Sequence, residues 1–75
     1  MSIKDKRQPN FGLSPREREI VSAVVAGYTN REIAEEFEIS QNTVRRHLCN
    51  IFDKLGVYTR LELALKTLAA QAPQR

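Results

Sequence analysis

Apolar residues recur every three or four positions along most of this chain, which is the spacing of an amphipathic helix. Four such stripes follow one another, and we predict no strands. The stripes consist of Ile20, Val21, Val24 and Val25; of Ile33, Ala34 and Phe37; of Val44, Leu48, Ile51, Phe52 and Leu55; and of Leu61, Ala64, Leu65 and Leu68. The pattern predicts an all-α fold, a four-helix domain.

Each stripe begins just after a residue that can cap a helix. Three of the caps stand three residues before a glutamate and so predict capping boxes, in which hydroxyl and carboxylate each accept a backbone N–H. These caps are Ser14, Thr29 and Thr59. Ser40 predicts a further N-cap, while Gly27 and Gly56 stand where a helix C-terminus favours a left-handed residue. We therefore expect the third helix to span about residues 41–55.

With 75 residues, 41% of them hydrophobic, the chain has room for one small domain and not for a deep substrate cleft. Residues 1–12 are polar and show no helical period, so we expect a flexible tail or linker there, with Phe11 packing back on the core. We expect the domain to span residues 13–71 and residues 72–75 to be frayed.

The sequence lacks the residues and motifs that several classes of protein require. Cys49 is the only cysteine, so the chain forms no internal disulfide, which suits a reducing, cytoplasmic location. No apolar run reaches the roughly 18 residues of a membrane span, and no signal peptide is recognisable. His47 is the only histidine, and there is no glycine-rich phosphate loop, Ser-His-Asp grouping or metal-ligand spacing. We expect no enzymatic activity, cofactor, metal or small-molecule substrate, and no membrane partner.

The second and third predicted helices are joined by only about three residues, which predicts a central helix-turn-helix. At about 100° per residue, the apolar side chains of the third helix fall within an arc of about 100°. The opposite face and its flanks carry Asn42, Arg45, Arg46, His47, Cys49, Asn50 and Asp53. Arginine pairs with the N7 and O6 acceptors of guanine, and asparagine pairs with adenine. This face predicts base reading in a DNA major groove.

Charge is distributed unevenly along the chain. The net charge is +3 and the isoelectric point about 9.4. Residues 40–75 contain six Lys and Arg and two acidic residues, whereas residues 1–39 contain six Lys and Arg and seven acidic residues. The second predicted helix is crowded by Glu32, Glu35, Glu36 and Glu38. The positive field therefore lies mainly on the third helix and the C-terminal segment after it, and it favours a polyanionic partner.

Seven short motifs occur in an order and spacing that are highly specific together. They are Leu13–Glu19, Gly27–Ala34, Ile39–Ser40, Thr43–His47, Asn50–Ile51, Lys54–Val57 and Thr59–Glu62. On these motifs the chain resembles the LuxR/FixJ-type (GerE-like) helix-turn-helix domain over about three-quarters of its length. The resemblance implies a domain of a bacterial transcriptional regulator that binds double-stranded operator DNA as a homodimer, at an inverted repeat.

The resemblance also implies roles for individual residues. Base contacts fall to Arg45, Arg46 and Cys49, and the residue type adds Asn42. Contacts with the DNA backbone or the edge of the groove fall to Asn30, Arg31, Thr43, His47 and Asn50. Two departures stand out. Arg31 and Arg45 replace the lysines usual in the family, and Cys49 replaces a residue that is commonly polar or basic.

In the family the fourth helix often pairs two domains, which here points to Leu61, Leu65 and Leu68 for dimerisation. These three leucines share one stripe, while Leu63 lies on the other side of the helix. One of the two sets should pack on the domain and the other should pair subunits.

Family members are commonly joined to an N-terminal receiver or ligand-binding domain. Pro9 and Gly12 resemble an interdomain linker, so we expect the C-terminal effector domain of a longer regulator, such as a response regulator. A complete small regulator is the alternative.

Two other functions stay open. A promoter-reading domain of a sigma factor is similar through the helix of Ile33 and Ala34 and the turn after it, and it would bind DNA as a monomer within RNA polymerase. A protein-interaction module that has lost DNA binding is the other, with the glutamate-rich second helix meeting a basic partner such as polymerase. The motif Lys54–Val57 and the capped fourth helix favour the first function, and Arg45 and Arg46 argue against the last.

Overall fold

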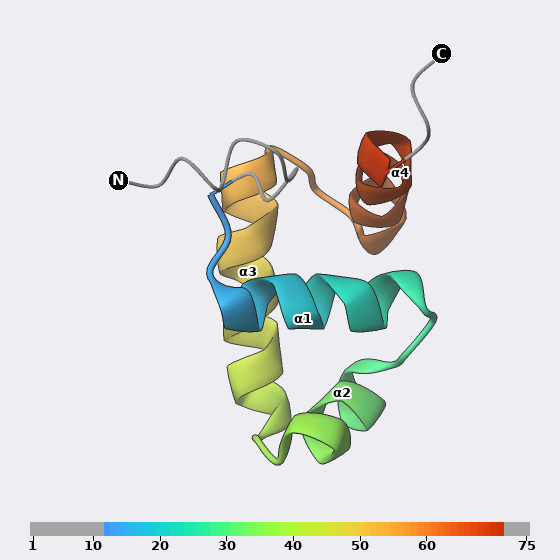
Figure 1. Ribbon diagram of the computed structural model, residues 1–75. Helices are drawn as coiled ribbons and strands as arrows, with labels where there is room; N and C mark the ends of the chain where they lie inside the picture. Colours follow the sequence, from blue (N-terminus) through green and yellow to red (C-terminus); the bar gives the residue numbers. More distant parts are fainter. Residues whose placement is uncertain (1–11, 72–75) are drawn as a thin grey trace.

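The computed structural model describes residues 12–71, which form four α-helices and no strand (Figure 1). They are α1 (Pro15–Val25), α2 (Asn30–Phe37), α3 (Gln41–Leu55) and α4 (Arg60–Gln71). The all-α prediction is confirmed, and α3 spans the predicted residues. The expected frayed end at residues 72–75 and the packing of Phe11 lie outside the described residues, as does the expected tail apart from Gly12.

Two of the three predicted capping boxes close in full. At α1 the Glu17 N–H donates to Ser14 Oγ (3.1 Å), and the Ser14 N–H donates to Glu17 Oε1 (2.8 Å). At α2 Thr29 and Glu32 exchange the same two bonds, at 3.1 and 2.9 Å. Ser40 caps α3 by accepting from the Thr43 N–H (3.0 Å).

The third box, at α4, is only half right. Thr59 Oγ1 accepts from the Glu62 N–H (3.0 Å), as predicted. The Glu62 carboxylate, however, accepts from the N–H of Tyr58 (2.6 Å), one residue before the expected donor. The N–H of Val57, the residue before Tyr58, is bonded to the Phe52 carbonyl (3.1 Å).

The turn between α2 and α3 has one feature that the sequence did not predict. Glu38 takes a left-handed conformation (φ 58°), which costs a non-glycine residue about 1 kcal/mol or more. The next N–H, of Ile39, donates back to the Ala34 carbonyl (3.0 Å), and the Ile39 side chain packs against the core. This bond and this packing offset the backbone cost and close the turn in three residues.

The core lies where the helices meet. Figure 1 shows α1 crossing α3, with α2 at one end of α3 and α4 above the far end of α1 in this view; α1 contacts both α3 and α4, and α2 contacts α3. The largest fully buried side chains come from all four helices: Ile20, Ile33, Val44, Ile51 and Leu63. Three large side chains of the predicted stripes pack against the core and are only partly buried, namely Val25, Phe37 and Phe52.

Helix α4 turns a different face to the core from the one that its leucine stripe suggests. Leu63 is fully buried and Thr67, one turn later, is 8% exposed. Leu61, Leu65 and Leu68 remain 67%, 57% and 49% exposed. Leu63 and Thr67 lie four residues apart on one side of the helix, so this side packs on the domain and the three-leucine stripe is left on the surface.

Candidate nucleic-acid interface

The outward face of α3 is polar and accessible, as the periodicity predicted. Val44, Leu48, Ile51 and Leu55 hold the opposite face in the core. The candidate base-reading residues Asn42, Arg45, Arg46 and Cys49 are all exposed, as is Asn50. The structure thus places these five side chains on one accessible surface, while their contact with DNA stays a prediction.

Asn42 and Arg45 do not act independently in this structure. The Arg45 guanidinium donates to Asn42 Oδ1 one turn earlier on α3. Reading of adenine by asparagine uses both the amide oxygen and the amide nitrogen. An amide oxygen has two lone pairs, so Asn42 Oδ1 can accept from Arg45 and from adenine together, and Arg45 keeps further donors for guanine or phosphate.

Thr43 and His47 lie at the edges of this face and are half-buried. The Thr43 hydroxyl is 2.9 Å from the Ser40 hydroxyl and belongs to the cap of α3. A hydroxyl can donate one bond and accept two, so this contact leaves it capacity for a phosphate oxygen. Both residues frame the polar face without lying at its centre.

Arg31 lies at the start of α2 and is exposed. Its Nε atom is 3.5 Å from Glu35 Oε2, with both side chains largely in solvent. An ion pair of this kind is worth about 0–1 kcal/mol, so a phosphate can compete for the guanidinium. The DNA-backbone contact of Arg31 stays a prediction, and its charge is partly balanced by Glu35 in the free protein.

Asn30, the first residue of α2, is bound from an unexpected direction. Arg60 Nη1, at the start of α4, donates to Asn30 Oδ1 (2.5 Å) across 30 residues of chain. Arg60 Nη2 donates to the carbonyl of Tyr28 (2.7 Å). Arg60 was not among the predicted site residues, because nothing near it in the sequence indicates a partner so distant.

These residues line one open hollow between the start of α2, the start of α3 and the start of α4. Its lining is made of Val24, Gly27, Tyr28, Thr29, Asn30, Arg31, Gln41, Arg60 and Leu61. The predicted backbone-contacting residues of α2 and the first residues of the predicted pairing helix therefore border the same surface depression.

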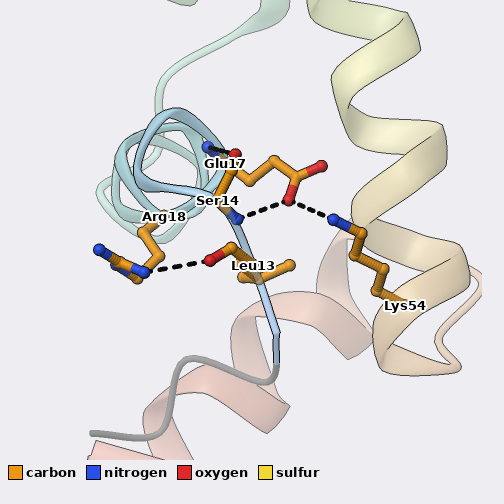
Figure 2. Close-up of polar contacts among 5 residues, drawn as sticks. All are labelled: Leu13, Ser14, Glu17, Arg18 and Lys54. Atoms are coloured by element: carbon orange, nitrogen blue, oxygen red, sulfur yellow. Dashed lines mark hydrogen bonds and ion pairs between the residues drawn. The ribbon is translucent and has the colours of Figure 1, made fainter. Parts of the chain in front are cut away.

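A partly buried ion pair joins α1 to α3 (Figure 2). Glu17 is only 5% exposed, and its Oε1 accepts from Lys54 Nζ at 2.8 Å as well as from the Ser14 N–H. Burial raises the pKa of Glu17, but the hydrogen bonds from Lys54 and Ser14 and the charge of Lys54 outweigh it, so the pKa lies below its ordinary value. The carboxylate is ionised at neutral pH and ties α1 to the last turn of α3.

The acidic residues of α2 border a second hollow, whose lining includes no residue of α3. Glu32, Glu35 and Glu36 are exposed and border a shallow hollow with Tyr28. In the described part of the chain, no three His, Cys, Asp or Glu side chains are grouped as metal ligands would be. None of the helices in residues 12–71 has the length and apolar character needed to cross a membrane.

Comparison with known proteins agrees with this geometry. Residues 12–67 match the family model described as bacterial regulatory proteins, luxR family (GerE). The probable HTH-type transcriptional regulator GfsR of Streptomyces halstedii is 43% identical over 60 residues, which cover 80% of this chain and 25% of that protein. The probable transcriptional regulatory protein SgaR of Hyphomicrobium methylovorum is 50% identical over 52 residues, 69% of this chain and 25% of SgaR.

A shorter relative is matched over most of its own length. The spore germination protein GerE of Bacillus subtilis is 43% identical over 56 residues, which cover 75% of this chain and 76% of GerE. The chain spans about a quarter of the length of GfsR and SgaR, and three-quarters of GerE. Because the family model covers well over half of the sequence and the fold contains the expected helix-turn-helix, the protein belongs to the luxR family of bacterial regulatory proteins.

Proposed function

We propose that this chain binds double-stranded DNA in a sequence-specific way and serves bacterial transcription regulation, with α3 lying in the major groove. The observation that carries the proposal is the exposed face of α3, where Arg45, Arg46 and Asn50 stand opposite a fully buried apolar stripe. Membership of a family of bacterial regulatory proteins supports it.

The two kinds of contact fall to different side chains. Phosphate contacts fix position and supply most of the affinity, and they fall to Asn30 and Arg31 on α2 and to three side chains of α3. The α3 side chains are Thr43, His47 and Asn50. Base contacts supply selectivity and fall to Asn42, Arg45, Arg46 and Cys49, with Cys49 offering a small, weakly polar contact.

We further propose that two copies bind one inverted repeat, with half-sites about one helical turn apart. The exposure of Leu61, Leu65 and Leu68 on one side of α4 supports pairing through that helix, because large apolar side chains in a row favour a partner surface. A cytoplasmic location, contact with RNA polymerase and a place as effector domain in a longer regulator belong to the same proposal.

Selection of a random duplex library by the purified chain, followed by sequencing, tests this function. An enriched inverted repeat would support a dimeric operator-binding regulator. A single asymmetric element would favour the sigma-like alternative, and the absence of enrichment, with retention lost at moderate salt, would leave only phosphate binding. Retention with little salt dependence and no preferred sequence would favour the protein-interaction alternative.

Arg46→Ala tests base reading directly. Loss of a bidentate contact with guanine should weaken binding to the enriched duplex by about 1–3 kcal/mol and relax preference at one base position. Arg46→Lys is the matched control, since it keeps the charge but loses the planar fork, so it should lose preference more than affinity. Fluorescence anisotropy on the enriched duplex and on single-base variants measures both. An unchanged affinity and preference in Arg46→Ala would remove Arg46 from the base-reading set.

A further inference from the structure

The amide of Asn30 has one accepting end and one donating end, and the structure shows which end faces inward. Its Oδ1 atom accepts from Arg60 Nη1 at 2.5 Å. A guanidinium has donors only, so the amide oxygen must face Arg60 and the amide nitrogen must face elsewhere. Asn30 and Arg60 are both half-buried. Their contact therefore sets the orientation of an amide that could otherwise turn by half a rotation.

Arg60 is itself held in place by a second bond. Its Nη2 donates to the carbonyl of Tyr28 (2.7 Å), just before the cap of α2, while its backbone begins α4. Tyr28 in turn is anchored to α1, because its N–H donates to the Ala23 carbonyl (3.0 Å). The guanidinium thus spans two acceptors on either side of Thr29, and the planar fork of arginine suits this better than the single ammonium of lysine.

A DNA phosphate oxygen can only accept hydrogen bonds. Of the two ends of the Asn30 amide, only the nitrogen can bind it, and the opposite orientation would turn an oxygen toward a negative charge. We propose that Arg60 is a positioning residue for DNA binding: it holds the Asn30 amide so that its N–H group is presented to a backbone phosphate. The proposal rests on the proposed function, in which the start of α2 meets the DNA backbone.

Four variants separate positioning from direct contact: Arg60→Met, Asn30→Ala, the double variant and Asn30→Asp. Their affinity for the duplex enriched by the wild-type chain is measured by fluorescence anisotropy at several salt concentrations. Asn30→Ala should weaken binding by roughly tenfold to a hundredfold, as loss of one hydrogen bond to a charged group predicts. Arg60→Met should weaken it by a similar factor. The double variant should then be no weaker than the weaker single variant, because both changes remove the same contact.

The salt dependence distinguishes positioning from contact. If Arg60 only positions Asn30, the slope of log affinity against log salt should stay as in the wild type. If Arg60 neutralises a phosphate itself, Arg60→Met should reduce that slope by about 0.9. Lys66→Met is the matched control, since it removes one positive charge from the same helix and reports any general effect of charge.

Asn30→Asp distinguishes a role of the Asn30–Arg60 contact in DNA binding from a role in the stability of the fold alone. The aspartate keeps an acceptor for Arg60, so thermal unfolding should be unchanged or shifted upward. It removes the amide donor, so DNA affinity should fall at least as far as in Asn30→Ala. Arg60→Lys, which keeps a charged donor group but not the planar fork, serves if Arg60→Met fails to fold, and it should retain part of the affinity.

Three results would overturn the proposal: additive losses in the double variant, a reduced salt slope in Arg60→Met, or full affinity in Asn30→Asp. Each requires that the wild-type chain bind the duplex, so each leaves the proposed function standing. If the wild-type chain itself binds no duplex, the proposed function fails first and the role of Arg60 falls with it.

Discussion

The start of α1 and the start of α4 carry the same arrangement of a hydroxyl cap and a glutamate three residues later, yet the two glutamates are bonded differently. Glu17 closes its box on Ser14, is 5% exposed and accepts from Lys54 of α3 (Figure 2). Glu62 is exposed and accepts from the N–H of Tyr58, with no hydrogen bond or ion pair from its carboxylate to another helix among the described residues.

The difference separates two roles of one motif. In both places the hydroxyl accepts from the third residue of the helix and marks where the helix begins. Only at α1 does a second helix supply a cation to the glutamate, so that the cap also joins two helices. A capping box thus predicts a helix start, whereas its contribution to the stability of the domain depends on what packs beside it.

The largest expected effect on this comparison comes from Glu17→Ala. It removes one half of a capping box and the acceptor of Lys54, so we expect the free energy of unfolding to fall by about 2–3 kcal/mol. Because the Lys54 side chain is 41% exposed, its ammonium can turn into water, which keeps the loss below that of breaking a fully buried pair. Chemical denaturation followed by circular dichroism measures the change.

Lys54→Met is the control for this variant. It leaves the Ser14 bond to Glu17 in place and should cost less, about 1–2 kcal/mol. If Glu17→Ala proved no more destabilising than Glu62→Ala, the ion pair with Lys54 would add nothing to the stability that the capping box at α1 provides.

A smaller effect is expected from pH, again through Glu17. The pKa of Glu17 in the folded protein lies below its ordinary value of 4.5, so the ionised carboxylate stabilises the fold above that value. This stabilisation should be lost as the pH falls below 4.5 and through the folded pKa. Glu17→Gln mimics the protonated group and does not titrate at this position. The free energy of unfolding of the wild type should therefore fall toward that of Glu17→Gln as the pH falls. Parallel stability curves for the two proteins, in denaturation measured from neutral to acidic pH, would contradict this account.

The smallest effect is expected from Glu62→Ala. The Thr59 hydroxyl still caps α4, and water can replace the carboxylate at the exposed Tyr58 N–H, so a loss of about 0.5 kcal/mol is expected. Thr59→Ala should cost more, about 1 kcal/mol, because it removes the acceptor for the first turn. Thermal unfolding of both variants measures the two losses. A larger loss in Glu62→Ala than in Thr59→Ala would mean that the bond accepted by the Glu62 carboxylate, and not the one accepted by the Thr59 hydroxyl, contributes more to the stability of α4.

The candidate interface shows a similar division between local pattern and tertiary contact. The exposed face of α3 could be predicted from helical periodicity alone, because Val44, Leu48 and Ile51 fix which side of the helix is buried. The bond from Arg60 to Asn30 joins residues 30 apart, and no repeat or cap connects them. The bond from Lys54 to Glu17 joins residues 37 apart, and it could not be predicted from the sequence either.

Helix α4 marks the boundary between what could and could not be predicted. Leucines on both sides of the helix left two possible core faces, and its contact with α1 decided for Leu63 over Leu61 and Leu65. The left-handed Glu38 is a second example, since a glutamate is not a usual signal for that backbone conformation.

By itself the sequence determined the helix count, the helix starts, the span of α3 and the side of α3 that is exposed. These properties depend on caps and on side-chain spacing, which act over about four residues. The tertiary structure alone decided which glutamate is buried, which face of α4 meets the core and which way the Asn30 amide points. Each of these depends on a partner from another helix, whose position is set only when the helices pack together.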